Sequence, residues 1–120
     1  YIAETEEKAM AEASRYFQEN MKMFGPLTLA RMLGEDGVEA LGDPQRAPTA
    51  GLPTIQDAVK AGQWLCGPPG LIIEKLEALQ ALYPGLDTVN AGSVIGTPQS
   101  VLIDQLEMFA SEVMPHFTGK

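Results

Sequence analysis

The turn Cys66-Gly67-Pro68-Pro69-Gly70 leads from a short apolar run into an amphipathic segment of this 120-residue sequence, and such a turn is a candidate for holding a ligand. A glycine turn at the start of a helix can bind phosphate through free backbone N–H groups. Prolines lack those N–H groups, so we favour a tight strand-to-helix turn without a ligand. Cys66 could line a ligand pocket, although a lone cysteine among apolar neighbours is more often a small core residue.

His116 is the only histidine, which makes it a candidate for acid–base chemistry. It follows the last apolar stripe, beside Met114 and Phe117, and no Asp, Ser or Cys partner stands near it in the sequence. We therefore expect a surface or interface role for His116. Trp64 could stack on a cofactor, but a tryptophan beside a buried strand usually contributes packing.

Three segments carry apolar residues at helical spacing and predict helices over 5–24, 69–83 and 98–114. Thr5 suits the start of the first, Pro68-Pro69 the second, and Thr97-Pro98 the third. The glycine–proline pair Gly25-Pro26 is expected to end the first helix, and Pro115 to end the last. The apolar stripes are Met10-Ala13-Phe17-Met21-Phe24, Ile72-Leu76-Leu79-Tyr83 and Leu102-Leu106-Phe109-Val113.

Shorter elements lie between these helices. Thr54 with Asp57 three residues later resembles a capping box and predicts a further helix that ends at Gly62. The stretches 63–66 and 86–95 read as strands, and residues 1–3 read like the end of another. Strands alternating with helices imply parallel strands joined by crossover helices. The predicted fold class is α/β and helix-rich, in a single unit over residues 1–120.

Residues 26–53 are rich in proline and glycine, and only Leu27 to Leu33 looks helical. Long loops in compact domains are often lids or mobile segments. We expect this variable, loop-rich excursion to cover a pocket. Arg31 and Arg46 are the cations in it that could meet the phosphate group of a cofactor.

Charge and composition exclude several classes of function. The net charge is -8 and no run of Lys or Arg offsets it, so neither nucleic acid nor an anionic membrane surface is an expected partner. No apolar stretch approaches the roughly 18 residues that span a bilayer, and no signal peptide is visible. Cys66 is the only cysteine, which excludes an internal disulfide and a cysteine-based metal cage. The acidic run Glu4-Glu6-Glu7 reads as a solvated helix start, and no metal site is predicted. These features predict a cytoplasmic protein.

Three phrases, in order, resemble the C-terminal part of bacterial-luciferase-like, flavin-dependent monooxygenases. They are Cys66-Gly67-Pro68-Pro69-Gly70 before a helix, Tyr83-Pro84-Gly85-Leu86-Asp87 before a strand, and Met108-Phe109-Ala110-Ser111-Glu112-Val113-Met114-Pro115 in the last helix. The opening Ala3-Glu4-Thr5-Glu6-Glu7-Lys8-Ala9 also resembles that family's strand-to-helix junction before its variable region. The strongest part of the resemblance is the last βαβα unit, residues 64–117.

The resemblance implies that the chain is the C-terminal fragment of a (β/α)8 TIM barrel. It implies an oxidoreductase that uses reduced flavin mononucleotide (FMN) and molecular oxygen to oxidise a small organic substrate. A separate flavin reductase would supply the reduced flavin. The family's catalytic histidine and most of its flavin contacts lie outside the part that this chain resembles, so no catalytic residue is carried over.

Active sites of such barrels lie at the carboxyl ends of the strands. On the implied fold, Asn90, Gly92 and Ser93 fall near the end of the last strand and are the best candidates for contact with a ligand. Cys66 and Gly67 occupy the preceding strand-to-helix turn. These five residues are the predicted cofactor-binding set.

Two alternatives stay open. A sister branch of the same superfamily uses a deazaflavin and transfers hydride, and nothing in the sequence excludes it. A small helical module that binds a partner through its apolar stripes is the non-enzymatic alternative. The opening Tyr1-Ile2-Ala3 reads as a strand end and favours a fragment. On that expectation the isolated chain is inactive and associates with other copies to cover its stripes.

Overall fold

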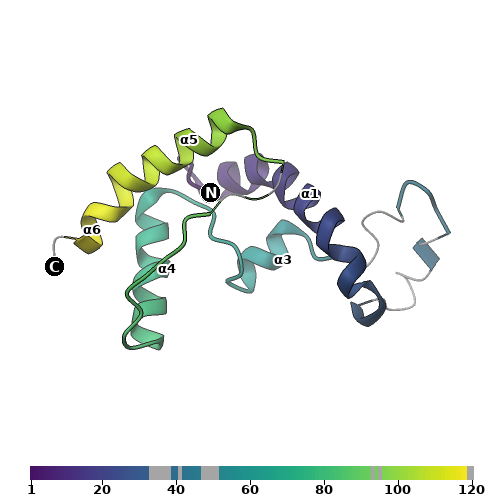
Figure 1. Ribbon diagram of the computed structural model, residues 1–120, viewed down its shortest axis with the longest axis horizontal. Helices are drawn as coiled ribbons and strands as arrows, with labels where there is room; N and C mark the ends of the chain where they lie inside the picture. The colour runs from purple at the N-terminus through teal and green to yellow at the C-terminus, as the bar shows by residue number, and fades with distance from the viewer. Residues whose placement is uncertain (33–38, 41, 47–51, 93, 95, 119–120) are drawn as a thin grey trace.

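The computed structural model describes residues 1–32, 39–40, 42–46, 52–92, 94 and 96–118, and within 24–32 it describes the backbone alone. The helices are α1 (Glu6–Met32), α3 (Ile55–Lys60), α4 (Pro69–Leu82), α5 (Gln99–Met108), the π-helical turn η2 (Phe109–Val113) and α6 (Met114–Thr118). Helices α5, η2 and α6 follow one another without a break and form a single rod. The rod lies above α4, and α1 and α3 lie on the other side of the molecule (Figure 1).

The described residues contain no β-strand, so the predicted α/β barrel fragment is wrong. The predicted strands at 63–66 and 86–95 are turn or irregular chain where the structure describes them. The bridge between Ile2 and Gly67, which is parallel, is the one ladder contact in this part of the chain. The segment predicted as a strand at 86–95 contains Asp87, Asn90 and Gly92, which are residue types that strands disfavour.

The bridge joins residues 1–3 to residues 65–67 through backbone hydrogen bonds. The Tyr1 amino group donates to the Leu65 carbonyl oxygen at 2.6 Å. The Gly67 N–H donates to the Tyr1 carbonyl oxygen at 3.1 Å. The Ala3 N–H donates to the Gly67 carbonyl oxygen, also at 3.1 Å. Two short extended segments therefore run side by side, although the pairing ends too soon to make a strand.

The other edge of this pair is covered by a side chain. The Ile2 N–H donates to Gln105 Oε1 at 2.6 Å, and Gln105 Nε2 donates to the Ile2 carbonyl oxygen at 3.0 Å. A carboxamide offers a donor and an acceptor as a peptide unit does. Gln105 thus takes the place that a neighbouring strand would occupy at Ile2.

Side chains of the two paired segments alternate between two hydrophobic clusters, as the period of extended chain requires. Tyr1, Ala3, Trp64 and Cys66 pack in the first cluster, which α1 and α3 complete. Ile2 and Leu65 pack in the second, which α4 and η2 complete. The paired segments therefore lie between two groups of helices. The fully or largely buried members are Ala9, Ala13, Phe17, Ile55, Ala58 and Cys66 in the first cluster, and Ile2, Ile72, Leu76 and Val113 in the second.

The helices predicted over 5–24, 69–83 and 98–114 are confirmed, with changes at their ends. The predicted cap of α3 is also confirmed. The Asp57 N–H donates to Thr54 Oγ1 at 3.2 Å, and the Thr54 N–H donates to Asp57 Oδ2 at 3.0 Å. Gly62, with φ of 74°, lies just beyond the end of α3, as a helix-terminating glycine should.

Two predicted helix ends are wrong. Helix α1 passes through Gly25-Pro26 and continues to Met32, because a proline weakens a helix without forbidding it. The final rod passes Pro115 as well. The widened turn η2 precedes that proline, and the Met114 N–H donates to the Phe109 carbonyl oxygen five residues back. Such a turn relieves the clash between a proline ring and the preceding turn of helix.

The excursion expected at 26–53 is helical over 26–32. Residues 33–38, 41 and 47–51 lie outside the described residues, and the lid expected of this segment lies largely there. Residues 42–46 form turns, with the Arg46 N–H donating to the Asp43 carbonyl oxygen at 3.1 Å.

The molecule is elongated, with extents of 54 × 33 × 22 Å and a radius of gyration of 16.4 Å. A compact chain of this length would have a radius of gyration of about 14 Å. Coverage of the stripes is accordingly uneven: Ile72, Leu76 and Val113 are buried, while the exposed fractions are 43% for Leu106 and 59% for Tyr83. Among the described helices, none combines the length and the apolarity that crossing a bilayer needs.

Candidate functional site

Two pockets flank the paired segments. The first, which we call the tyrosine pocket, has a volume of about 330 Å³, and residues that line it include Tyr1, Tyr16, Trp64, Asn90, Gly92 and Gln105. The second, the cysteine pocket, has a volume of about 380 Å³, and its lining includes Met10, Val59, Cys66, Leu71 and Lys75. Trp64 and Leu65 line both pockets, because the extended chain runs between them.

The four predicted ligand-contact residues that the structure describes do not line one pocket. Asn90 and Gly92 both line the tyrosine pocket, as the prediction requires of a shared site. Cys66 lines the cysteine pocket instead. Gly67 is a buried backbone position that pairs with Ile2, and Ser93 lies outside the described residues.

Gly67 and Cys66 have structural reasons for their residue types. The φ of Gly67 is 153°, and a Cβ atom there would lie 2.7 Å from Leu71 Cδ2, so only glycine lets α4 begin so close to the chain. The Cys66 side chain is buried in the first cluster. Burial raises the pKa of the Cys66 thiol, and the nearby Tyr1 amino group only partly opposes this shift. The thiol is therefore protonated near neutral pH and is a poor nucleophile.

The polar end of the tyrosine pocket is built on Tyr1. Its ring stacks on that of Tyr16, with centroids 6.4 Å apart and planes at 26°. Burial, then a hydrogen bond with Glu12 and the negative charges of Glu12, Tyr16 and Asp104, raise the pKa of the Tyr1 hydroxyl to about 12. The hydroxyl consequently stays protonated at physiological pH and donates its proton to the Glu12 carboxylate.

The remainder of the tyrosine pocket is largely apolar. Trp64 is held edge-on against Phe17, with centroids 4.9 Å apart and planes at 85°. Ile72, Leu102 and Phe109 also line the pocket. An apolar cavity of this size with a few polar groups is the usual form of a small-molecule site.

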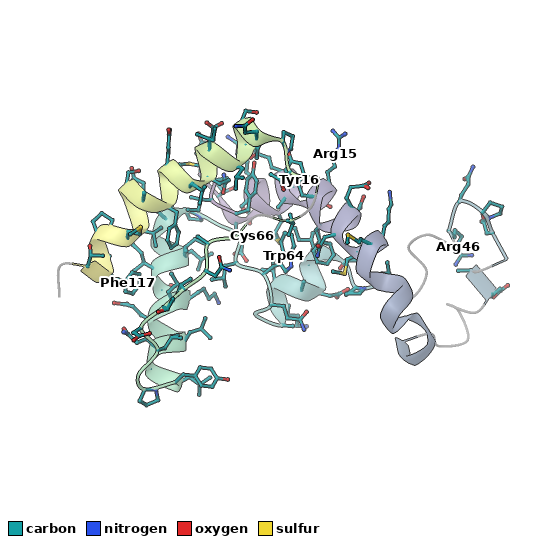
Figure 2. All side chains as sticks on the ribbon, in the orientation of Figure 1. Arg15, Tyr16, Arg46, Trp64, Cys66 and Phe117 are labelled. Atoms are coloured by element: carbon teal, nitrogen blue, oxygen red, sulfur yellow. The ribbon has the colours of Figure 1, made fainter. Side chains whose placement is uncertain are left out.

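The other candidate side chains lie away from this pocket. His116 Nε2 lies 2.8 Å from Glu77 Oε1, in an exposed contact that joins α6 to α4. Arg46 lies beyond the C-terminal end of α1, far from Trp64 and Cys66 (Figure 2). The side chain of Arg31 lies outside the described residues. Within the described part of the chain, no group of three His, Cys, Asp or Glu side chains is arranged to hold a metal ion, and Glu4, Glu6 and Glu7 form none.

Sequence reasoning missed Tyr1, Tyr16 and Gln105 as pocket residues. A signal existed for Gln105, which lies three residues after Leu102 and four before Phe109, on the apolar stripe of the final rod. A polar residue on such a stripe indicates a partner for its amide, here the backbone of Ile2. The two tyrosines carried no comparable signal, because their meeting depends on where residues 1–3 lie against α1.

Comparison of the chain with protein families, with curated proteins and with solved structures finds no match. The tyrosine pocket, where Asn90 and Gly92 meet Trp64, is therefore the main basis for inferring a function.

Proposed function

We propose that this chain acts as part of a flavin-dependent monooxygenase, which uses reduced FMN and molecular oxygen to oxidise a small organic substrate. The observation that carries the proposal is the tyrosine pocket, an apolar cavity that includes Asn90 and Gly92. These two residues belong to the predicted cofactor-binding set. An apolar pocket suits an organic substrate, because binding removes apolar surface from water. A flavin reductase would be the partner that supplies the reduced flavin.

The residues of the pocket fit the organic substrate better than they fit FMN. Among the described lining residues there is no Lys, Arg or His side chain to hold a phosphate group. The start of α4 offers little help, since Pro68 and Pro69 carry no N–H group. No step through the flavin follows from these residues, and the contacts to its phosphate would come from elsewhere in the enzyme.

The test uses the full-length product of the gene that encodes this sequence. Anaerobic titration with reduced FMN should show binding in the micromolar range, and reoxidation in air should release hydrogen peroxide more slowly than free reduced FMN does. A parallel titration with a reduced deazaflavin separates the monooxygenase from the hydride-transfer alternative. Failure of the full-length product to bind reduced FMN would overturn the proposal.

The 120-residue chain alone should not turn over substrate and should bind FMN weakly, with a Kd above about 100 μM, which corresponds to about 5.5 kcal/mol of binding free energy. The reason is the missing phosphate contacts described above. Isothermal titration with FMN measures this directly. Micromolar binding by the isolated chain would contradict the assignment of the flavin contacts to another part of the enzyme.

A helical interaction module is the second candidate function. It is favoured by the final rod, on which the side chains of Ile103, Leu106 and Met114 have exposed fractions of 44%, 43% and 43%. Such side chains would be covered in a complex with another protein. Failure of the full-length product to bind either reduced FMN or a reduced deazaflavin would favour the interaction module over the monooxygenase.

A further inference from the structure

The shape and surface of the tyrosine pocket limit the kind of molecule that it can hold. Aromatic rings of Tyr1, Tyr16, Trp64 and Phe109 line it, and rings pack well on other rings. At its rim, Val89 and Leu106 have exposed fractions of 49% and 43%. An apolar ligand would cover these two side chains, which favours its binding by removing apolar surface from water.

The charges around the pocket limit the ligand further. Glu12 and Asp104 are exposed carboxylates next in the chain to Ala13 and Gln105, which line the pocket, and their negative charges act on the hydroxyl of Tyr1, another lining residue. No Lys, Arg or His side chain is found among the lining residues that the structure describes. The Tyr1 amino group donates a hydrogen bond to the Leu65 carbonyl oxygen at 2.6 Å. It also lies beside Cys66, which lines the cysteine pocket. An anion entering the tyrosine pocket would lose hydration and gain no opposite charge.

We propose that the tyrosine pocket binds uncharged, ring-containing apolar molecules and rejects anionic ones, and that Glu12 and Asp104 enforce this selection. The inference rests on the proposed function only in identifying the bound molecule as the organic substrate of the enzyme. The charge selection itself follows from the residues around the pocket and needs no flavin.

A matched pair of fluorescent probes tests the selection. N-phenylnaphthylamine and anilinonaphthalene sulfonate share their ring system and differ in the sulfonate charge. Trp64 is the only tryptophan and lines both pockets, so quenching of its emission reports binding in either one. The emission of the probe itself reports binding in the variants, and Ala91, which lines the tyrosine pocket and not the cysteine pocket, distinguishes the two. The neutral probe should bind at one site per chain. The anionic probe should bind at least tenfold more weakly at low salt, and the difference should shrink as the salt concentration rises.

Two sets of variants assign the selection to named residues. The double variant Glu12→Gln with Asp104→Asn should reduce the tenfold difference to threefold or less, because both carboxylates are neutralised. The control Glu107→Gln with Glu112→Gln removes the same net charge from exposed positions that are not among the charges acting on Tyr1, and it should keep the difference. Ala91→Trp, at an exposed lining position, should fill the pocket and weaken the neutral probe at least tenfold, with an unchanged circular dichroism spectrum.

Equal affinity for the two probes would overturn the proposal, as would full binding of the neutral probe by a folded Ala91→Trp variant. Binding that rises with the dimer fraction would also overturn it, since the probe would then occupy a face between copies. The assay contains no flavin, so its failure leaves the reduced-FMN test of the proposed function unaffected. If the probes show charge selection but the full-length product does not bind reduced FMN, the tyrosine pocket keeps its preference for uncharged molecules and loses only its role as a substrate site.

Discussion

Gln105 joins distant parts of the chain through one carboxamide and one peptide unit. Replacing it with leucine removes both hydrogen bonds to Ile2 and leaves a partly buried N–H and C=O without partners. We expect the Gln105→Leu variant to lose about 2–3 kcal/mol in the free energy of unfolding. Urea unfolding followed by circular dichroism measures the loss. Gln99→Leu, at an exposed position of the same helix, serves as control and should change stability by less than about 0.5 kcal/mol. Equal losses in the two variants would argue against the role of Gln105.

The reactivity of the Cys66 thiol gives a second prediction at the residue scale. Its side chain has an exposed fraction of 3%, and burial raises the pKa of its thiol. Both effects protect it, because only an accessible thiolate reacts with alkylating or disulfide reagents. The folded chain should therefore react with Ellman's reagent at least a hundredfold more slowly than the chain in urea. Rapid labelling of the folded chain would show that Cys66 is reachable, and would reopen the prediction that it contacts a ligand.

The structure brings some of the predicted ligand-contact residues together and separates others, and physical reasons explain the difference. Asn90 and Gly92 were predicted together and line the same pocket, since they are close neighbours in the chain. Cys66 and Gly67 were grouped with them on an implied fold that the structure contradicts. Alternation in an extended segment directs Cys66 away from the side that Leu65 faces. Trp64 and Leu65 face opposite sides and line both pockets, so local sequence does not reveal which pocket a residue of this segment lines.

At the scale of elements, local start signals predicted the helices well. Pro69 at the start of α4 and the Thr54–Asp57 cap of α3 act within a few residues, so sequence alone is enough to identify them. The stop at Gly25-Pro26 failed because a proline weakens a helix without forbidding it, and the stop at Pro115 failed because the widened turn η2 precedes it. The predicted strands failed for another reason. A strand needs a long paired neighbour, and residues 65–67 find only residues 1–3.

The cap of α3 gives a prediction with a defined pH dependence. Hydrogen bonds from Thr54 lower the pKa of the Asp57 carboxyl. A lowered pKa means that the carboxylate stabilises the folded state above its ordinary pKa, and that this contribution is lost as the pH falls through the lowered value. Asp57→Asn should therefore destabilise the chain at pH 7, and the destabilisation should shrink as the pH falls below the ordinary pKa of an aspartic acid, about 3.9.

Thermal unfolding at pH 7 and at pH 3 measures the effect. Thr54→Ala removes the hydroxyl of the same cap and should cost about 1 kcal/mol. Gln56→Ala, inside α3 but exposed and outside the cap, is the matched control. An Asp57→Asn penalty that is the same at both pH values would exclude the charged cap as its cause.

At the scale of the whole molecule, the described surface leaves much apolar area uncovered. Besides the rod, Leu82 and Met23 have exposed fractions of 67% and 53%. The radius of gyration of 16.4 Å reflects the same lack of compactness. The two hydrophobic clusters are small, and they meet only along the short paired segments. Chains with such surfaces reduce their free energy by packing against a further surface.

We therefore expect the 120-residue chain to self-associate in solution. Leaving several large apolar side chains in water costs several kcal/mol at about 25 cal/mol per Å², which is a large share of the stability of a small domain. The net charge of -8 opposes association only weakly, because physiological salt screens it.

Light scattering across a dilution series should show a mass above that of the monomer, which falls on dilution. Ile103→Asp with Met114→Asp should shift the chain toward the monomer, since both side chains are exposed on the final rod. Ser100→Asp with Ala110→Asp adds the same charge at exposed small residues of that rod and should shift it less. A wild-type chain that is strictly monomeric and unfolds cooperatively would refute this expectation, because it would show that these residues form a self-sufficient core.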